Sequence, residues 1–224
     1  MHQLLVHFFD FAPVWKFWPV ILRGFLLTIE MAVLTIAIGI PLGLVLAVVR
    51  LLGNRFVNLL IIIHIDVFRA VPQLVLIVLA YFALPYVGVT LDPPTATVGA
   101  LAMVLSALAE EIFWATIQAV PKGQWEAGRS TGLGFFTTLR SIVLPQAIRM
   151  SVPPLTNRAI GISKGTTLGS VISAPEILNV TSSLQSNTAN PTLLTVGAIL
   201  FEVLFLPLVR SSRWLERKLR KRGA

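Results

Sequence analysis

Two adjacent glutamates, Glu110 and Glu111, are the residues of this sequence that come closest to a catalytic arrangement. Paired carboxylates can act as general acid and general base only when both reach the reacting atoms. Neighbouring residues on an α-helix point about 100° apart, so these two cannot face one cavity squarely. The histidines His2, His7 and His64 are scattered and cysteine is absent, so no metal-ligand set accompanies the carboxylates. We therefore expect neither catalytic nor metal-binding residues.

A second segment with the residue types of a chemical site is Lys164-Gly165-Thr166-Thr167. Lysine, glycine and threonine hold phosphates in nucleotide-binding loops that follow the pattern G-x-x-x-x-G-K-[ST]. That pattern is missing here, and the segment lies in an apolar region of the chain. We therefore expect the chain to hydrolyse no nucleotide and to need no cofactor.

The elements that must position these residues are apolar enough to lie in a membrane. Hydrophobic side chains make up 55% of the 224 residues, charged side chains make up 12%, and the mean hydropathy is +0.82. Soluble domains carry about 25% charged residues, so a water-exposed surface is excluded. We predict an all-α integral membrane fold with five transmembrane helices, because five apolar segments can each cross about 30 Å of hydrocarbon. They cover residues 24–49, 56–84, 97–120, 142–173 and 192–209.

The fourth apolar segment differs from the other four because it is interrupted by helix breakers and charges. These are Arg149, Pro153, Pro154, Arg158, Gly161, Lys164, Gly165 and Gly169. Proline removes a backbone hydrogen bond, and such interruptions at membrane depth are tolerated where they line a protein cavity. We therefore expect this segment to be broken or strongly bent and to line a cavity.

The distribution of basic residues predicts the orientation of the chain. Seven lysines and arginines crowd the last fifteen positions, whereas the connections 83–95 and 173–191 carry none. Positive residues mark the cytoplasmic side of a membrane, so we expect the amino terminus outside and the carboxyl terminus inside. No basic stretch is interleaved with exposed aromatics, which argues against nucleic-acid binding.

The same features divide the chain into three parts. Residues 1–23 contain Asp10, Pro13, Lys16 and two tryptophans, which favours an amphipathic interfacial segment over a signal peptide. Residues 24–209 form the predicted transmembrane domain, with a cytoplasmic helix at about 121–135, and residues 210–224 form a basic cytoplasmic tail.

Nine charged residues fall within the predicted spans, where each costs about 2.5–3.5 kcal/mol at the bilayer centre unless paired or hydrated. They are Glu30, Asp66, Arg69, Glu110, Glu111, Arg149, Arg158, Lys164 and Glu202. Asp66 and Arg69 are three residues apart on one helical face, so Arg69 either pairs with Asp66 or contacts a substrate. For Glu30 and Glu202 we favour a structural role against a neighbouring helix or a second copy of the chain.

The connection after the third span has the pattern of a short helix on the cytoplasmic side. Pro121 and Gly123 end the preceding span, and residues 126–130 then favour a helix with Glu126 in its first turn. Gly132 and Gly134 can end that helix in the left-handed conformation that glycine permits. A short, rigid helix of this kind is a natural docking element for another protein.

This connection closely resembles the signature of the permease subunits of binding-protein-dependent ABC importers, in the polar amino acid branch. The family pattern E-A-A-x-x-x-G, nine residues, I-x-L-P is matched at Glu126, Ala127, Gly132, Ile142, Leu144 and Pro145. Gly128 replaces the second alanine. Further likenesses are Phe68-Arg69-Ala70-Val71-Pro72 to F-R-G-T-P, Gly123-Gln124-Trp125-Glu126-Ala127 to G-Q-x-E-A, and Lys164-Gly165-Thr166-Thr167-Leu168 to K-D-T-S-L.

The resemblance implies a permease subunit of the bacterial inner membrane that passes a polar amino acid across the bilayer. It implies as partners a second permease chain, two ABC ATPase subunits that carry out the ATP hydrolysis, and a solute-binding protein that delivers the substrate. The expected ATPase-coupling residues are Gly123, Gln124, Glu126, Ala127, Gly132, Leu133 and Pro145.

The resemblance also implies a substrate pathway, and it suggests a specificity. The expected pathway residues are Arg69, Pro72, Glu111, Asn157, Arg158, Lys164, Thr166 and Thr167. Permeases for basic amino acids carry an acidic residue at the position of Arg158, so the reversed sign favours an acidic or carboxylated amino acid. Alternatively, Arg158 neutralises Glu110 or Glu111. Trp114 and Leu108 depart from the branch, which has arginine and tyrosine there.

Two alternatives belong to other functional classes. An ion-coupled secondary amino acid transporter or channel would use the intramembrane carboxylates, but such proteins usually show paired broken helices, and the sequence indicates only one. A membrane enzyme would need a catalytic constellation, and no such pattern is present.

Overall fold

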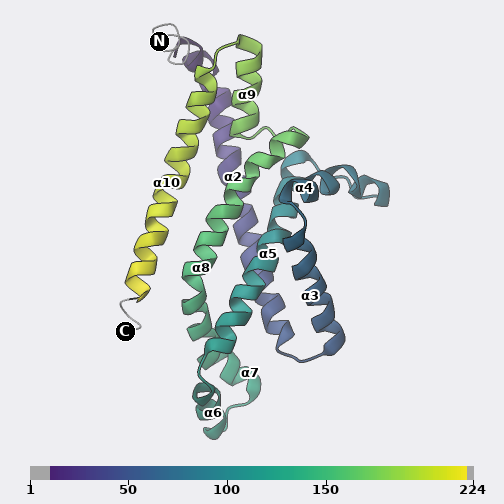
Figure 1. The fold of residues 1–224 in the computed structure, drawn as a ribbon, viewed down its shortest axis with the longest axis vertical. Coiled ribbons are helices and arrows are strands. Elements are labelled where there is room, and N and C mark those ends of the chain that lie inside the picture. Colours follow the sequence, from purple (N-terminus) through teal and green to yellow (C-terminus); the bar gives the residue numbers. More distant parts are fainter. Residues whose placement is uncertain (1–10, 221–224) are drawn as a thin grey trace.

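The computed structural model describes residues 11–220, and every regular element within that range is helical (Figure 1). The predicted all-α fold is confirmed for these residues. The α-helices are α2 (Ala12–Arg50), α3 (Arg55–Ala70), α4 (Gln73–Phe82), α5 (Pro93–Ala119), α6 (Lys122–Ser130), α7 (Phe135–Thr138), α8 (Leu144–Lys164), α9 (Ile177–Thr188) and α10 (Thr192–Arg220). Short stretches of other helix types are the 3₁₀-helices η1 (Leu84–Val87) and η3 (Gly165–Ile172) and the π-helix η2 (Leu139–Val143).

The centre of the bundle is the packing of α2 against α5. A Cβ atom added at Gly39 would lie 2.8 Å from the Cβ of Leu105, and one added at Gly43 would lie 2.6 Å from the Cβ of Ala109. Such distances leave no room for a side chain, so the two glycines let the helix backbones approach closely. Small residues at helix contacts are typical of membrane bundles, in which close packing drives association.

Helix α2 is longer than the apolar segment 24–49 that the sequence indicates. It runs unbroken for 39 residues from Ala12, and Val14 and Ile21 in its first turns are buried with residues of α9 and α10. Residues 12–23 of the predicted interfacial segment therefore belong to a packed helix. Residues 1–10 lie outside the described part, and the interfacial placement stays a prediction.

The second predicted span is not one continuous helix, which corrects the expectation for residues 56–84. α3 and α4 meet at a bend of 106°, and Val71, the first of the two residues between them, has an extended backbone. The cause is Pro72, because the ring of a proline clashes with a helical conformation of the residue before it. The bend directs the amino terminus of α4 towards Gly165, at the end of α8.

The fourth segment is less broken than expected. α8 continues through Pro153 and Pro154 up to Lys164, and the helix type changes only at Gly165, where the 3₁₀-helix η3 begins. Neighbouring helices can compensate the hydrogen bonds that prolines remove from a membrane helix. η3 ends at Ile172, and the next residue, Ser173, has a positive φ of 66° that turns the chain towards α9.

Within the described residues, three helices are long and apolar enough to cross a membrane: α2, α5 and the first 21 residues of α10. The bent pair α3–α4 passes the same test as one span, which gives four. α8 has 21 residues, so its polar composition, including Arg149 and Arg158, keeps it below that threshold. A multi-pass membrane protein is supported, whereas five crossings and the sidedness of the termini stay predictions.

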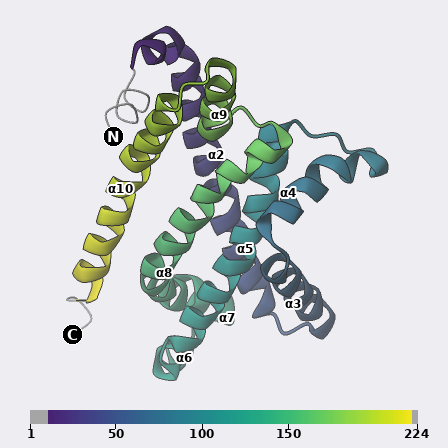
Figure 2. The same ribbon diagram turned by 45° about the horizontal axis from the view of Figure 1, so that its top comes forward.

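The two ends of the bundle carry different elements. The first turns of α2 lie beside α9 and the start of α10 at one end (Figure 1), while α6 and α7 lie at the other. α10 runs from the first end towards the second. The turned view keeps α6 and α7 at the end opposite to α9 (Figure 2). The structure thus separates the cationic connections at 50–55 and 122–129 from the connection 173–191.

Candidate functional site

The short helix α6 lies in the connection that the sequence predicts to be cytoplasmic. It begins at Lys122, four residues earlier than expected, so Glu126 lies in its middle rather than in its first turn. Gly132 has the expected left-handed backbone with a φ of +85°, and the N–H of Leu133 donates to the carbonyl of Gly128. Gly134 does not share that conformation, since its φ is −69°.

Close packing against α7 and η2 fixes the position of α6. Trp125 stacks on Phe135 with ring centroids 5.5 Å apart and planes at 21°. Gly128 is buried, and a Cβ atom there would lie 2.6 Å from Cγ2 of Thr138. The side-chain amide of Gln146 donates to Oε1 of Gln124 at 3.2 Å, which joins α6 to α8. These contacts connect α6 to α7, to η2 and to the start of α8.

The expected coupling residues mostly form an exposed surface on this end of the bundle. Gly123, Gln124, Glu126, Ala127, Gly132 and Pro145 are exposed, and Leu133 is half-buried. Glu126 forms no ion pair with any described residue, so its carboxylate is available to a partner. The π-helix η2 lies between α7 and α8, and π-helices are rare and often occur at functional positions.

The first of the two adjacent glutamates is held inside the bundle. Nη1 of Arg50 lies 3.0 Å from Oε1 of Glu110, whose side chain is fully buried. The guanidinium of Arg50 also lies 4.4 Å from the centroid of the Trp114 ring. Trp114, one of the departures from the branch, therefore covers an ion pair between α2 and α5.

The second glutamate pairs with a different arginine. Nη1 of Arg69 donates to Oε1 of Glu111, and both side chains are partly exposed. The alternative in which Arg69 pairs with Asp66 is therefore wrong, because Arg69 reaches across to α5 instead. The alternative in which Arg158 neutralises Glu110 or Glu111 is also wrong, since each glutamate has another partner.

The bend between α3 and α4 opens a groove of about 500 Å³ beside this second pair. Its lining includes Arg69 and Pro72, together with Gln73 at the start of α4, Leu108 of α5 and Leu168 of η3. Oε1 of Gln73 occupies the space in which a Cβ atom of Gly165 would lie, at 2.7 Å. The break before α4 and the break after α8 therefore face each other.

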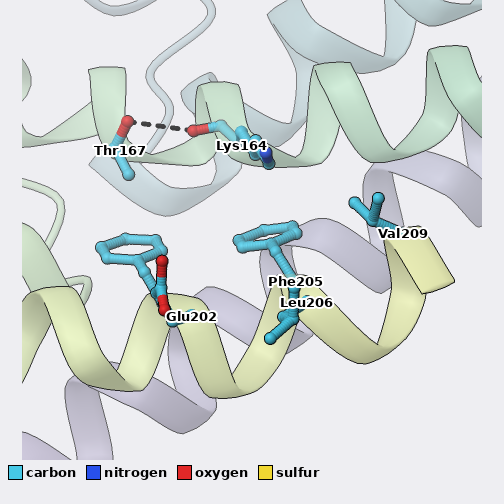
Figure 3. Close-up of a pocket in the computed structure, with 7 residues that line it drawn as sticks. Lys164, Thr167, Glu202, Phe205, Leu206 and Val209 are labelled. Carbon is cyan, nitrogen blue, oxygen red and sulfur yellow. Dashed lines mark hydrogen bonds between the residues drawn. The ribbon is translucent and has the colours of Figure 1, made fainter.

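The remaining candidates lie along α8 and η3. Lys164 and Thr167 line a second groove, of about 530 Å³, whose opposite wall is α10 (Figure 3). Asn157 is seven residues before Lys164, on the same helical face, and its Oδ1 accepts a hydrogen bond from Ser212 of α10 at 3.1 Å. Four of the substrate residues that the resemblance indicates therefore form two groups, with Arg69 and Pro72 at the first groove and Lys164 and Thr167 at the second.

Arg158 and Thr166 belong to neither group. Arg158 is exposed and forms no ion pair with a described residue. It is six residues from Lys164, which places it about 120° around the helix. Thr166 is buried, and its hydroxyl donates to the carbonyl of Ser163 at 2.9 Å. The roles expected for both remain predictions.

Sequence reasoning missed Gln73 and Glu202 as residues of the two grooves. Gln73 directly follows Pro72, so the extended conformation imposed on Val71 could have identified it as the first residue of a new helix. Glu202 was interpreted as structural, and no local signal places it opposite Lys164. Among the described residues, no three His, Cys, Asp or Glu side chains gather as metal ligands would.

Comparison with known proteins identifies the family. A family model described as the inner membrane component of binding-protein-dependent transport systems matches residues 39–221. The L-cystine transport system permease protein TcyB of Bacillus subtilis (strain 168) is 32% identical over 206 residues, which cover 91% of this chain and 88% of TcyB. The glutamine transport system permease protein GlnP of Escherichia coli (strain K12) is 30% identical, and the match covers 95% of this chain and 98% of GlnP.

Solved structures agree with these relatives. A crystal structure of an amino acid ABC transporter with histidines contains a chain that is 31% identical, has a TM-score of 0.83, and is matched over 93% of this chain and 98% of that one. Inward-facing MetNI, a methionine ABC transporter, has a TM-score of 0.66 at 19% identity, so it supports the fold alone. The chain belongs to the family of inner membrane components of binding-protein-dependent transport systems, and the resemblance to amino acid permeases is confirmed.

Proposed function

We propose that this chain is the permease subunit of an ATP-driven importer for polar amino acids, and that separate ATPase subunits act on it through α6. The observation that carries the proposal is the position of α6. It is a short helix at one end of the bundle that bears the family signature, exposes Glu126, and is packed tightly against α7 and η2.

The contacts of α6 support a mechanical role. Gly128 against Thr138 and Gln124 against Gln146 connect α6 to the segment that becomes α8. α8 carries Lys164, and η3 continues it past both grooves. Closure of two ATPases would then move α6 and α8 together and shift the bundle between inward-facing and outward-facing states, as a rigid-body transition.

The partners follow from family membership. Two such chains would form the translocation pathway, as two copies of this chain or as this chain with a related permease. A solute-binding protein would deliver the substrate at the end of the bundle that carries α9, opposite to the ATPases. The separation of the cationic connections from residues 173–191 along the bundle axis supports this arrangement.

We infer that the substrate is an acidic or carboxylated amino acid, and Arg158 carries this inference. Its guanidinium is exposed and unpaired among the described residues, which leaves it available for a substrate carboxylate. The relatives are named for L-cystine, glutamine and octopine, so identity of about 31% leaves the choice of amino acid open. Uptake by Arg158→Glu, measured with aspartate and with arginine, tests the inference, and an unchanged preference would overturn it.

One observation supports the alternative, an ion-coupled secondary transporter. The chain has two interrupted helices facing each other, at Val71 and at Gly165, and paired interruptions occur in secondary transporters. ATP depletion separates the two proposals. The importer stops transporting when ATP is removed, whereas a secondary transporter continues as long as the ion gradient is maintained.

Co-purification tests the coupling to an ATPase. A separate ATPase subunit expressed together with this chain should bind wild type and be lost from Glu126→Lys. The change should leave the fold intact, because the side chain of Glu126 is exposed and forms no ion pair with a described residue. Leu52→Lys is the matched control, because Leu52 is also exposed in a connection predicted to lie on the same side. Loss of the ATPase from both variants, or from neither, would contradict docking at Glu126.

A further inference from the structure

The groove between α10 and the α8–η3 segment holds two opposite charges, and the family resemblance assigns a role to only one of them. Lys164 and Thr167 form one wall, while Phe201, Glu202 and Phe205 belong to the other (Figure 3). The groove measures about 530 Å³, which is within the range of about 300–1,000 Å³ that small-molecule sites occupy.

Neither charge is neutralised by the chain itself. Among the described residues, Lys164 and Glu202 take part in no ion pair, and both side chains are exposed at the groove. The ammonium of Lys164 lies over the ring of Phe205, 5.7 Å from Nζ to the centroid. Both charged ends are therefore free to contact a molecule that enters.

The position of Glu202 in the membrane makes contact with lipid unfavourable. It lies ten residues from each end of the apolar stretch Thr192–Ser212, close to its middle. A carboxylate at that depth is unfavourable unless it is hydrated or paired. Intramembrane charges of this kind face a water-filled cavity or another protein group, so the groove belongs to the interior of the assembly.

The aromatic wall suits a ligand that carries a positive charge. The rings of Phe201 and Phe205 are stacked, with centroids 6.1 Å apart and planes at 12°. Aromatic faces attract cations, and they add to the attraction of a nearby carboxylate. A wall of two rings and one carboxylate, facing a lysine, therefore offers complementary places for an ammonium group and a carboxylate group.

We propose that Glu202 binds the α-ammonium group of the amino acid in transit, with Phe201 beside it, and that Lys164, whose ammonium lies over the ring of Phe205, binds the α-carboxylate. Both groups are common to all amino acids, so this groove recognises the zwitterion, while side-chain selectivity resides elsewhere, at Arg158. The proposal rests on the proposed function. It adds Glu202, which the sequence favoured as a structural residue.

The experiment compares an amino acid with its deaminated analogue in proteoliposomes that contain the complete importer. The probe is the best transported of the twenty tritiated L-amino acids, and the analogue has hydrogen in place of the ammonium group. Wild type should bind and transport the amino acid in preference to the analogue. Glu202→Gln should lower uptake of the amino acid by about tenfold or more, the effect of losing one charge-assisted hydrogen bond, and should remove the preference.

Two further variants test the other end of the site and provide a control. Lys164→Met should also lower uptake but keep the preference for the ammonium group, because it removes the other end of the site. Glu30→Gln is the matched control, since Glu30 is an exposed glutamate on α2 outside both grooves. It should behave as wild type does.

The outcomes separate the two proposals. If wild type transports none of the twenty amino acids with ATP, the proposed function fails. If wild type transports one and Glu202→Gln keeps both its rate and its preference, the role of Glu202 is overturned and the proposed function stands. If Glu202→Gln instead dissociates the paired permease on size-exclusion chromatography, the groove holds a second chain, which also overturns the role of Glu202.

Discussion

Gly128 of α6 lies directly against the side chain of Thr138, where α7 meets η2. A Cβ atom at position 128 would be 2.6 Å from Cγ2 and 2.9 Å from Oγ1 of Thr138. The branch signature has alanine at this position, whereas in this chain the side chain of Thr138 leaves no room for a Cβ atom. The hydroxyl of Thr138 is buried and makes no hydrogen bond, which means that the contact is one of shape alone.

The first prediction follows from this contact. Gly128→Ala should destabilise the chain by about 1–3 kcal/mol, because a methyl group is forced into a filled space. In a Thr138→Ala background the same change should be neutral or stabilising by up to about 1 kcal/mol, since alanine is the better helix former. Unfolding of the four proteins in mixed micelles measures this double-mutant cycle. Equal effects in both backgrounds would contradict the steric explanation.

The second prediction concerns the two ion pairs. The Arg50–Glu110 pair is largely buried, with side chains 21% and 0% exposed. Removal of one partner of a buried pair costs about 3–5 kcal/mol, while hydrophobic replacement of both is often nearly neutral. Arg50→Met should therefore destabilise strongly, and Arg50→Met combined with Glu110→Leu should recover most of the loss in free energy of unfolding.

The Arg69–Glu111 pair provides the comparison. Its side chains are 45% and 40% exposed, and a pair exposed to this extent contributes at most about 1 kcal/mol to stability. Arg69→Met should therefore lower the rate of transport but lower the free energy of unfolding by at most about 1 kcal/mol. If Arg69→Met destabilises as strongly as Arg50→Met, the distinction between a structural pair and a pair at the groove is wrong.

The third prediction is a pH dependence of stability that arises at Glu176, outside the helices that qualify as membrane spans. Glu176 caps α9, is fully buried, and accepts hydrogen bonds from the backbone N–H groups of Leu178 and Asn179. Burial raises its pKa from 4.5 to about 7. Between these values the folded chain keeps a proton that the unfolded chain releases, so stability falls as the pH rises from 4.5 to 7.

Thermal unfolding at several pH values checks this prediction. Glu176→Gln should remove a decrease in stability on the order of 3 kcal/mol across that range. Asp92, the exposed cap of α5, should show the opposite pH dependence of stability. Hydrogen bonds from Thr95, chiefly from its side chain, lower the pKa of Asp92. Its contribution is present at neutral pH and is lost on acidification. Identical pH profiles for wild type and Glu176→Gln would refute the assignment.

The sequence predicted those parts of the molecule that depend on local patterns. Apolar length located the helices, and the signature at Glu126 located α6 because proline and glycine act on their own neighbours. The bend at Val71 was also encoded locally, by Pro72, but the surrounding apolar run concealed it. The partners of Glu110 and Glu111 are 60 and 42 residues away in the chain. A single sequence contains no signal that pairs such distant residues, and the same holds for Glu202 and Lys164.

The side of the membrane on which α6 lies is the most direct test of force transfer from an ATPase. Because the sequence contains no cysteine, Glu126→Cys introduces a unique thiol, and Ser186→Cys introduces one in the exposed part of α9 as the opposite marker. A membrane-impermeant maleimide should label position 126 only from the cytoplasmic side, and the bound ATPase should protect it. Labelling of position 126 from outside, or no labelling from either side without ATPase, would contradict the proposed coupling.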